Sequence, residues 1–385
     1  MRDVFVAGTG LVKFGELWDK GLREIGVEAV LKALEDAKVD LKEVDAFYVG
    51  TMSSGRFAGQ EHCGALITGE LGINVPSMRV EGACASGGLA FREAYLSILS
   101  GKFDVVVALG MEKMTDLTTE EVTLTLSAAA DQEWESYYGV TFPGLYALMA
   151  RRHMHEYGTK REQMAMVAVK NHENAALNPF AQFRNKITVE DVLNSTPVAD
   201  PLNLLDCSPI TDGAAAVVLT TKEFAERNGK ALVKVSGSGL ATDSLALHNR
   251  ESLTGIKAAK IAAKKAYEES NFSPGKIDVA EVHDCFTIAE IMAYEDLGFV
   301  EKGKGGKFIE DGETKINGSI PVNTSGGLKA CGHPVGATGI KQVCEIVMQL
   351  RGEAGERQVK DARVGLTHNV GGSGATCVVN ILERL

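Results

Sequence analysis

The sequence lacks any apolar run long enough to span a bilayer, and its first residues, 1–8, follow a strand pattern rather than that of an apolar export signal. It also lacks an excess of positive charge, because 40 Lys and Arg face 51 Asp and Glu for a formal net charge of -11. This balance argues against a general nucleic-acid role and means that local Lys, Arg or backbone N–H groups must hold any anionic ligand. We therefore expect a cytoplasmic protein without a membrane or nucleic-acid partner.

The seven cysteines show no paired framework, and their number is odd in a chain with no export signal. Such cysteines are free thiols more often than disulfides, and most of them are expected to be small buried side chains. The early glycines Gly8, Gly10 and Gly15 lack the Gly-x-Gly-x-x-Gly spacing of a dinucleotide loop, so they predict a simple turn after a strand. Neither a disulfide scaffold nor dinucleotide binding is therefore expected.

The chain contains an internal repeat. Apolar residues at helical spacing predict a helix over 22–37, and a strand pattern follows over 44–50. The same order returns over 256–267 and 277–283, where Asp278 follows Asp45 by 233 positions. In each half a second strand, a Cys-bearing Gly-rich loop, a helix closed by Gly and another strand come next. These segments are 76–80, the Cys84 loop, 89–100 and 103–110 in the first half, and 320–323, 326–339, 340–351 and 364–367 in the second.

The first half carries a long insertion. The closing strand of the second half is predicted at 375–381, directly after its neighbour, whereas its counterpart at 212–219 comes only after residues 111–206. We therefore predict an α/β protein with a first half at 1–110 plus 207–228, an inserted loop domain at 111–206 and a second half at 229–385.

Two helices are expected in the insertion, one over 145–157 and one opened by a capping box at 159–162. A long insertion beside a Cys loop is a candidate ligand-binding subdomain. A surface elaboration that only packs is the alternative.

The run Gly82-Ala83-Cys84-Ala85-Ser86-Gly87-Gly88 lies between a strand pattern and a helix pattern. A thiol at such a turn faces unsatisfied backbone N–H groups and the positive end of the helix dipole, and both favour the thiolate. Cys84 is therefore the candidate nucleophile.

Three further segments place His or Cys beside Gly or a turn. They are His283-Asp284-Cys285-Phe286, Gly332-His333-Pro334 and His368-Asn369-Val370-Gly371-Gly372. Each follows or flanks a predicted strand end, where ligand sites gather in α/β sheets. The repeat predicts that these strand ends meet Cys84 across a pseudo-twofold axis.

Together with the segments 207–216 and 326–339, these motifs resemble the thiolase family, most closely its archaeal and sterol-carrier-protein-type acetyl-CoA acetyltransferases. The resemblance covers the whole chain. It implies two pseudo-twofold-related halves in a layered α-β-α-β-α sandwich with an inserted loop domain, assembled as a homodimer or homotetramer. It further implies coenzyme A and acetyl-CoA as substrates, with no permanently bound cofactor and no metal.

The resemblance assigns roles to the two thiols. Cys84 would carry the acetyl group as a thioester, and His333 would take the proton of its thiol. The base for the second substrate is a Cys of the last loop in the common thiolases, but this chain has His368-Asn369 there. Cys285 would supply that base, as in the sterol-carrier-protein-type thiolases. Its alternative is a buried Cys past a strand end, and Cys377 is expected to lie in the core.

The resemblance also assigns the oxyanion donors. His283 replaces a family Asn and would bind the enolate oxygen together with His333, while the backbone N–H groups of Cys84 and Gly371 would hold the acyl oxyanion. His368 would orient the thiols or tune their charge, although the register of its loop against the family pattern stays open.

Coenzyme A would enter through the insertion. Ser208 and Phe286 match family residues that contact the pantetheine arm, and Arg184 is a candidate for the phosphates, with a solvated surface position as its alternative.

The expected reaction joins two acetyl-CoA into acetoacetyl-CoA and coenzyme A and feeds mevalonate synthesis. The archaeal resemblance adds a complex with 3-hydroxy-3-methylglutaryl-CoA synthase and a small zinc/OB-fold protein. Four alternatives stay open: a longer-chain 3-ketoacyl-CoA thiolase, a ketoacyl synthase of the same fold, a non-catalytic scaffold, and a zinc site of His283, Cys285, Cys331 and His333.

Overall fold

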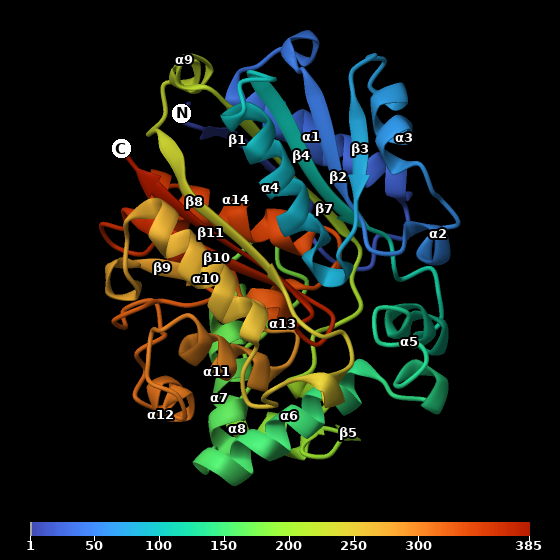
Figure 1. Cartoon of the computed structure of the whole chain (residues 1–385), viewed down its shortest axis with the longest axis vertical. Coiled ribbons are helices and arrows are strands. Elements are labelled where there is room, and N and C mark those ends of the chain that lie inside the picture. The colour runs from blue at the N-terminus through green and yellow to red at the C-terminus, as the bar shows by residue number, and fades with distance from the viewer. Residues whose placement is uncertain (1) are drawn as a thin grey trace.

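The computed structural model describes residues 2–385 and contains one sheet of nine strands, in the order β3-β2-β4-β7-β1-β8-β11-β10-β9. Figure 1 shows the first half of the chain at the upper right and the second half at the lower left. The strands are β1 Phe5–Leu11, β2 Ala46–Gly50, β3 Ser77–Val80, β4 Val105–Glu112, β7 Gly213–Thr220, β8 Val233–Thr242, β9 Val279–Glu281, β10 Val364–Gly371 and β11 Thr376–Arg384.

The predicted repeat is visible in the strand order. From the edge of the sheet inward, the strands of the first half follow the order β3-β2-β4-β7-β1. From the opposite edge inward, those of the second half follow the order β9-β10-β11-β8. The two halves join through β1 and β8, which pair at Phe5 with Lys234 and at Val6 with Val233.

Asp45 and Asp278 have equivalent roles, as their spacing in the repeat suggests. The Asp45 carboxylate accepts from the backbone N–H groups of Asp104 and Val105 at the start of β4, at 2.8 and 3.0 Å. The Asp278 carboxylate accepts from Arg363 and Val364 at the start of β10, at 2.8 and 2.9 Å. Each Asp therefore fixes the start of a central strand of its half.

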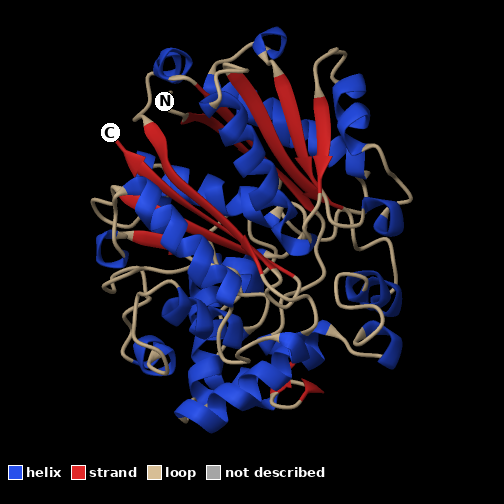
Figure 2. Cartoon of the chain, viewed as in Figure 1, coloured by secondary structure: helices blue, strands red, loops and turns tan. Residues whose placement is uncertain are grey.

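The helices form the predicted layers around these strands (Figure 2). Helices α4 and α14 pack against each other and against strands of both halves, whereas α1 covers the outer face of the first half and α10 that of the second. The buried side of α4 is mostly apolar. Helix α14 also buries polar and charged side chains, among them Lys341, which pairs with Glu281 of β9 at 3.0 Å, and Glu345, which pairs with Arg357 at 3.0 Å. The helices are α1 Leu22–Ala37, α2 Ser54–Phe57, α3 Cys63–Glu70, α4 Ser86–Leu99, α5 Thr119–Ser127, α6 Phe142–Tyr157, α7 Arg161–Ala176, α8 Val189–Asn194, α9 Lys222–Ala225, α10 Lys257–Ser270, α11 Thr287–Asp296, α12 Gly305–Glu310, α13 Gly327–Cys331 and α14 Thr338–Arg351.

The insertion supplies α5 to α8 and a two-stranded sheet of β5 Pro197–Ala199 and β6 Leu202–Asn203. Helices α6 to α8 lie in the lower part of the view in green, beside α11 and α12 of the second half (Figure 1). The division at residues 110, 207 and 229 stays a prediction. No helix within residues 2–385 is long and apolar enough to cross a membrane.

The predicted capping box at the start of α7 is shifted by one residue. Lys160 is the N-cap, and its backbone N–H donates to Oε1 of Gln163 at 3.0 Å. The Thr159 hydroxyl instead lies 2.7 Å from Nδ1 of His153 in α6. The Thr side chain thus ties α6 to the start of α7 and is not free to cap.

The strand predicted over 320–323 does not form. Only a single bridge between Ala280 and Val322 connects this segment to β9. Pro321 has no N–H to donate, and Asn323 adopts a left-handed backbone with φ of 57°, which ends the extended path. The second half therefore lacks a full counterpart of β3.

Candidate active site

A pocket with about 170 Å³ of accessible space lies where the two halves meet the insertion. The residues that line the pocket come from the Cys84 loop, from α5 and α6, and from the segments after β4, β6, β9, α13 and β10. They are Cys84, Met114, Val122, Thr123, Leu126, Phe142, Pro143, Tyr146, Cys207, Ser208, Pro209, Ile210, Cys285, Phe286, His333, Val335 and Gly372.

Cys84 sits in a single 3-10 turn, Ala83–Ala85, directly before α4. Ala83 has a φ of 53°, a strained backbone for a residue with a side chain, and such strain is common where a nucleophile is presented. Ser86 fixes the turn because its Oγ accepts from the Gly82 N–H at 3.0 Å and donates to the Ala83 carbonyl at 2.6 Å. The half-buried thiol thereby faces the pocket.

Burial raises the pKa of the Cys84 thiol to about 12, although the backbone N–H groups of Gly372 and of Cys84 itself lower it. Desolvation therefore raises the pKa of Cys84 by more than the start of the helix lowers it, contrary to the expected thiolate. At neutral pH the sulfur carries its proton and needs a base. The neighbouring N–H that lowers this pKa belongs to Gly372. Gly371, the predicted donor to the acyl oxyanion, packs its backbone against the Gly82 carbonyl.

His283 and His333 lie beside Cys84. One ring nitrogen of each and the Cys84 sulfur lie within 4.8 Å of one another, and the two rings stand nearly perpendicular with centroids 5.1 Å apart. Burial lowers the pKa of His333 to about 3 and holds that of His283 well below its ordinary value. Both imidazoles are therefore neutral at physiological pH.

Thr338 determines which nitrogen of His333 carries the proton. Its Oγ1 lies 2.7 Å from Nδ1 of His333, and its own hydroxyl donates to the Pro334 carbonyl at 3.0 Å. The hydroxyl has only one hydrogen, so its oxygen accepts from the Nδ1–H of His333. This assignment leaves a lone pair on Nε2, which is what a base for a thiol requires.

Cys285 lines the same pocket and faces the hydroxyl of Tyr146, a residue of α6. Burial raises the pKa of the Cys285 thiol well above its ordinary value, while the hydrogen bond from Tyr146 lowers it. In this structure the single hydrogen of the Tyr146 hydroxyl is donated to the Gly372 carbonyl at 3.1 Å, and the Tyr146 ring lies 4.7 Å from that of Phe286. Tyr146 was not predicted, because a helical pattern in the insertion gives no signal for a pocket residue.

Asp284 links the segment of the second thiol to the segment of His333. Its carboxylate accepts from the backbone N–H groups of Leu328 and Lys329 at 2.6 and 3.1 Å, and from Asn171 Nδ2 at 2.7 Å. A side chain at Gly327 would overlap this carboxylate, so glycine is required there. The start of α13, and with it the loop that carries His333, is thus fixed to the Cys285 segment.

His368 is buried outside the lining of the pocket. Its Nδ1 accepts from the backbone N–H of His283 at 3.4 Å, and burial lowers its pKa to about 3. The structure therefore connects His368 to the backbone of His283 and not directly to either sulfur.

Two family models match this chain: "Thiolase, N-terminal domain" over residues 4–223 and "Thiolase C-terminal domain-like" over residues 237–384. The chain belongs to the thiolase family. It is 57% identical over 385 residues to the acetyl-CoA acetyltransferase of Methanothermobacter thermautotrophicus, with 100% of each chain covered. It is 35% identical to human sterol carrier protein 2, covering 98% of this chain and 71% of that protein. A solved structure named Ltp2-ChsH2(DUF35) aldolase is 27% identical with a TM-score of 0.87, covering 99% of this chain and 98% of that one.

As a thiolase, the chain is an acyltransferase, and its predicted substrate contacts divide into two groups. Ser208 and Phe286 line the pocket, and the Ser208 N–H donates to the Cys285 carbonyl at 2.9 Å. Arg184 is exposed, outside the pocket lining, and donates to the Ala176 carbonyl at 3.1 Å. The structure thus brings the two predicted arm contacts into the pocket of the thiols but leaves Arg184 on the surface of the insertion.

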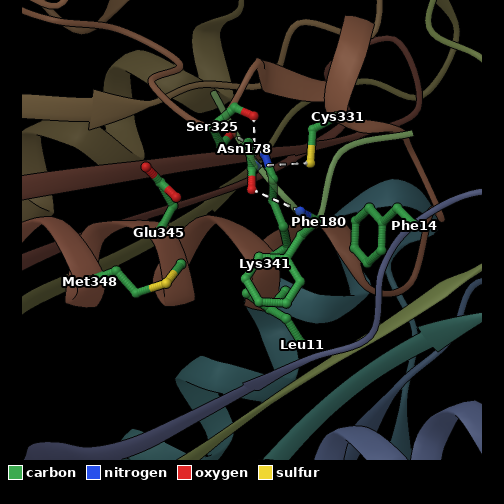
Figure 3. Close-up of a pocket in the computed structure, with 9 residues that line it drawn as sticks. All are labelled: Leu11, Phe14, Asn178, Phe180, Ser325, Cys331, Lys341, Glu345 and Met348. Atoms are coloured by element: carbon green, nitrogen blue, oxygen red, sulfur yellow. Dashed lines mark hydrogen bonds between the residues drawn. The ribbon is translucent and has the colours of Figure 1, made fainter. Parts of the chain in front are cut away.

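The alternative zinc site would require the Cys331 sulfur to lie close to His283 and His333. Figure 3 shows Cys331 in a separate cavity, where Asn178 Nδ2 lies 3.7 Å from its sulfur. Cys331 is buried there among Phe14, Asn178 and Lys341 and does not line the pocket of Cys84. The ligand-type atoms that do come together are those of Cys84, His283 and His333. Cys377 is buried in β11, as predicted for a core residue.

Proposed function

We propose that this thiolase is an acetyl-CoA C-acetyltransferase that condenses two acetyl-CoA into acetoacetyl-CoA and coenzyme A through an acetyl-Cys84 intermediate. The observation that carries the proposal is the grouping of the Cys84 sulfur with neutral His283 and His333 in a pocket that also holds the Cys285 thiol. The acetyl-CoA acetyltransferase that is 57% identical to this chain supports the acetyl group as the substrate.

In the first step Nε2 of His333 takes the Cys84 proton, and the sulfur attacks the thioester carbonyl of acetyl-CoA. The carbon–sulfur bond to coenzyme A breaks, and the leaving thiolate takes the proton of Cys285. The N–H groups of Gly372 and Cys84, which contact this sulfur, hold the oxyanion that forms during the transfer. The products are acetyl-Cys84, free coenzyme A, protonated His333 and a Cys285 thiolate.

In the second step the Cys285 thiolate removes a proton from the methyl group of another acetyl-CoA. The enolate oxygen that develops accepts hydrogen bonds from His283 and from protonated His333. The enolate carbon then attacks the acetyl carbonyl, so that a carbon–carbon bond forms and the bond to the Cys84 sulfur breaks. The released thiolate recovers its proton from His333, which restores the resting enzyme.

Replacing Cys84 by Ala tests the proposal in an assay of coenzyme A-dependent cleavage of acetoacetyl-CoA. We expect the parent protein to be active and the variant to be inactive. Unchanged activity in the variant would refute the role of Cys84, and an inactive parent would favour a non-catalytic scaffold.

A longer-chain 3-ketoacyl-CoA thiolase is the second candidate, because Met114, Val122 and Leu126 give the pocket an apolar wall. A panel of 3-ketoacyl-CoA substrates of increasing length separates the two functions. We expect kcat/KM to be highest for acetoacetyl-CoA, and a preference for long or branched chains would overturn the assignment.

We also propose a homodimer or homotetramer that supplies mevalonate synthesis in a complex with 3-hydroxy-3-methylglutaryl-CoA synthase and a small zinc/OB-fold protein. The name of the solved relative, which joins Ltp2 to ChsH2(DUF35), supports a small protein partner. Light scattering would measure the size of the oligomer. Copurification with both partners tests the complex, and failure to associate at micromolar concentrations would contradict it.

A further inference from the structure

Asn369 of β10 lies at the last loop and has no assigned role in the reaction. It is buried, and its side chain makes three polar contacts that connect the two halves. Its Oδ1 accepts from the Gly88 N–H at 3.0 Å, its Nδ2 donates to the Cys84 carbonyl at 3.0 Å, and the same Nδ2 lies 3.2 Å from Nδ1 of His283.

These contacts determine the orientation of the amide. A backbone N–H only donates and a backbone carbonyl only accepts, so Gly88 and Cys84 place Oδ1 and Nδ2 without ambiguity. The NH₂ group of Asn369 therefore points a hydrogen at Nδ1 of His283, which must accept it. The single ring proton of the neutral imidazole then lies on Nε2, which is buried with no hydrogen-bond partner in residues 2–385.

The two histidines beside Cys84 consequently have opposite proton placements. Thr338 keeps the proton of His333 on Nδ1 and leaves a lone pair at Nε2, whereas Asn369 keeps the proton of His283 on Nε2. We propose that Asn369 is a positioning residue that fixes His283 as a hydrogen-bond donor and so prevents the Cys84–His283–His333 group from binding a metal ion. The inference rests on the proposed function, in which His283 donates to the enolate oxygen.

Cys84, His283 and His333 together offer the donor atoms of a metal site. One sulfur and two imidazole nitrogens within 4.8 Å of one another match the ligands of open zinc sites. Because the NH₂ group of Asn369 occupies the lone pair of Nδ1, a metal at His283 would have to bind Nε2. That would place the ring proton on Nδ1, directly against the NH₂ group. An Asp at this position would accept that proton, and a carboxylate behind a histidine is the arrangement that orients zinc ligands.

The first test is the proton placement in the parent protein, measured by ¹⁵N NMR of histidine-labelled protein without substrate. The spectrum of H283Q assigns the His283 signals. We expect an unprotonated Nδ1 and a protonated Nε2 for His283, and the reverse for His333. A protonated Nδ1 of His283 in the parent overturns the inference and leaves the roles of Cys84 and Cys285 untouched.

The second test compares Asn369→Asp with Asn380→Asp as the matched control. Asn380 is buried in the neighbouring β11, donates to the Thr367 hydroxyl at 3.1 Å and accepts from Ser238, away from the pocket. After exposure to Zn²⁺ and removal of the excess, we expect about one bound zinc per chain in N369D and none in the parent or in N380D. Co²⁺ should give a thiolate charge-transfer band in N369D alone.

Condensation in metal-free N369D should fall about 100-fold, the usual loss for one oxyanion donor, while acetylation of Cys84 continues. Equal zinc binding by the parent and N369D would overturn the inference. If N369D does not fold, the NMR measurement on the parent decides alone. If Cys84→Ala keeps its activity in the acetoacetyl-CoA assay, the proposed function is refuted. That result would not affect the proton placement on His283.

Discussion

The structure predicts that Tyr146→Phe separates the two chemical steps. The Tyr146 hydroxyl faces the Cys285 thiol and lies outside the hydrogen bonds of His333 and Thr338. When Cys285 ionises, we expect the Tyr146 hydroxyl to turn its single hydrogen from the Gly372 carbonyl to the sulfur. A hydrogen bond to a charged group contributes about 1.5–3 kcal/mol, and this one would stabilise the Cys285 thiolate that follows the first step. At about 1.4 kcal/mol for each tenfold change in rate, its loss should slow condensation about 10- to 100-fold.

Rapid quenching with labelled acetyl-CoA measures both steps of this prediction. In Y146F we expect acetyl-Cys84 to form at a rate within about twofold of the parent and then to accumulate, because less of Cys285 is in the thiolate form that removes the methyl proton. Tyr95→Phe is the control, since the Tyr95 hydroxyl bonds Glu269 at 2.7 Å away from the pocket and its loss tests only general stability. Equal loss of both steps in Y146F, or no loss of condensation, would refute this reasoning.

Three further substitutions test the site. Thr338→Val removes the acceptor for Nδ1 of His333, so acetylation of Cys84 in a single turnover should fall about tenfold with little change in KM; an unchanged rate would contradict the assigned proton position. Gly371→Ala would overlap the Gly82 carbonyl, and we expect a loss of about 1–3 kcal/mol in denaturant unfolding, whereas parent-like stability would show that the loop can yield. Arg184→Ala should raise KM for coenzyme A two- to fivefold at low salt if it meets the phosphates, and an unchanged KM supports a purely solvated position.

Much of the fold and of the candidate site could be predicted because both depend on local patterns that repeat. The 233-residue interval from Asp45 to Asp278 marks the paired halves, and the Gly-rich turn at Cys84 marks the strand end where the pocket lies. The strand expected over 320–323 fails for a reason that is also local, since Pro321 and the backbone of Asn323 interrupt pairing.

What could not be predicted depends on contacts between distant segments. Tyr146 belongs to an insertion helix with an ordinary apolar pattern, and only the fold brings it 4.7 Å from the ring of Phe286. The Gly372 N–H at the resting Cys84 sulfur gave no signal in the sequence, and the role of Gly371 as an oxyanion donor stays a prediction. The protonated state of Cys84 depends on desolvation by the whole pocket, which the local helix-start argument does not include.

The low pKa values of the histidines lead to a final prediction about pH. Burial lowers the pKa of His333 to about 3 and raises that of Cys84 to about 12, so between these limits the pair is a neutral imidazole beside a protonated thiol. Protonation of His333 would remove the base only near pH 3, and ionisation of Cys84 would make the base unnecessary only at high pH. The partner of His333 is the uncharged hydroxyl of Thr338, which does not raise the imidazole pKa as a carboxylate would. We therefore expect the single-turnover rate of Cys84 acetylation to be flat from about pH 5 to pH 9. If the rate instead changes with a midpoint near pH 6.5, the ordinary pKa of His, then His333 is solvated in the working enzyme. The reaction would then not proceed from the desolvated pocket that this structure shows.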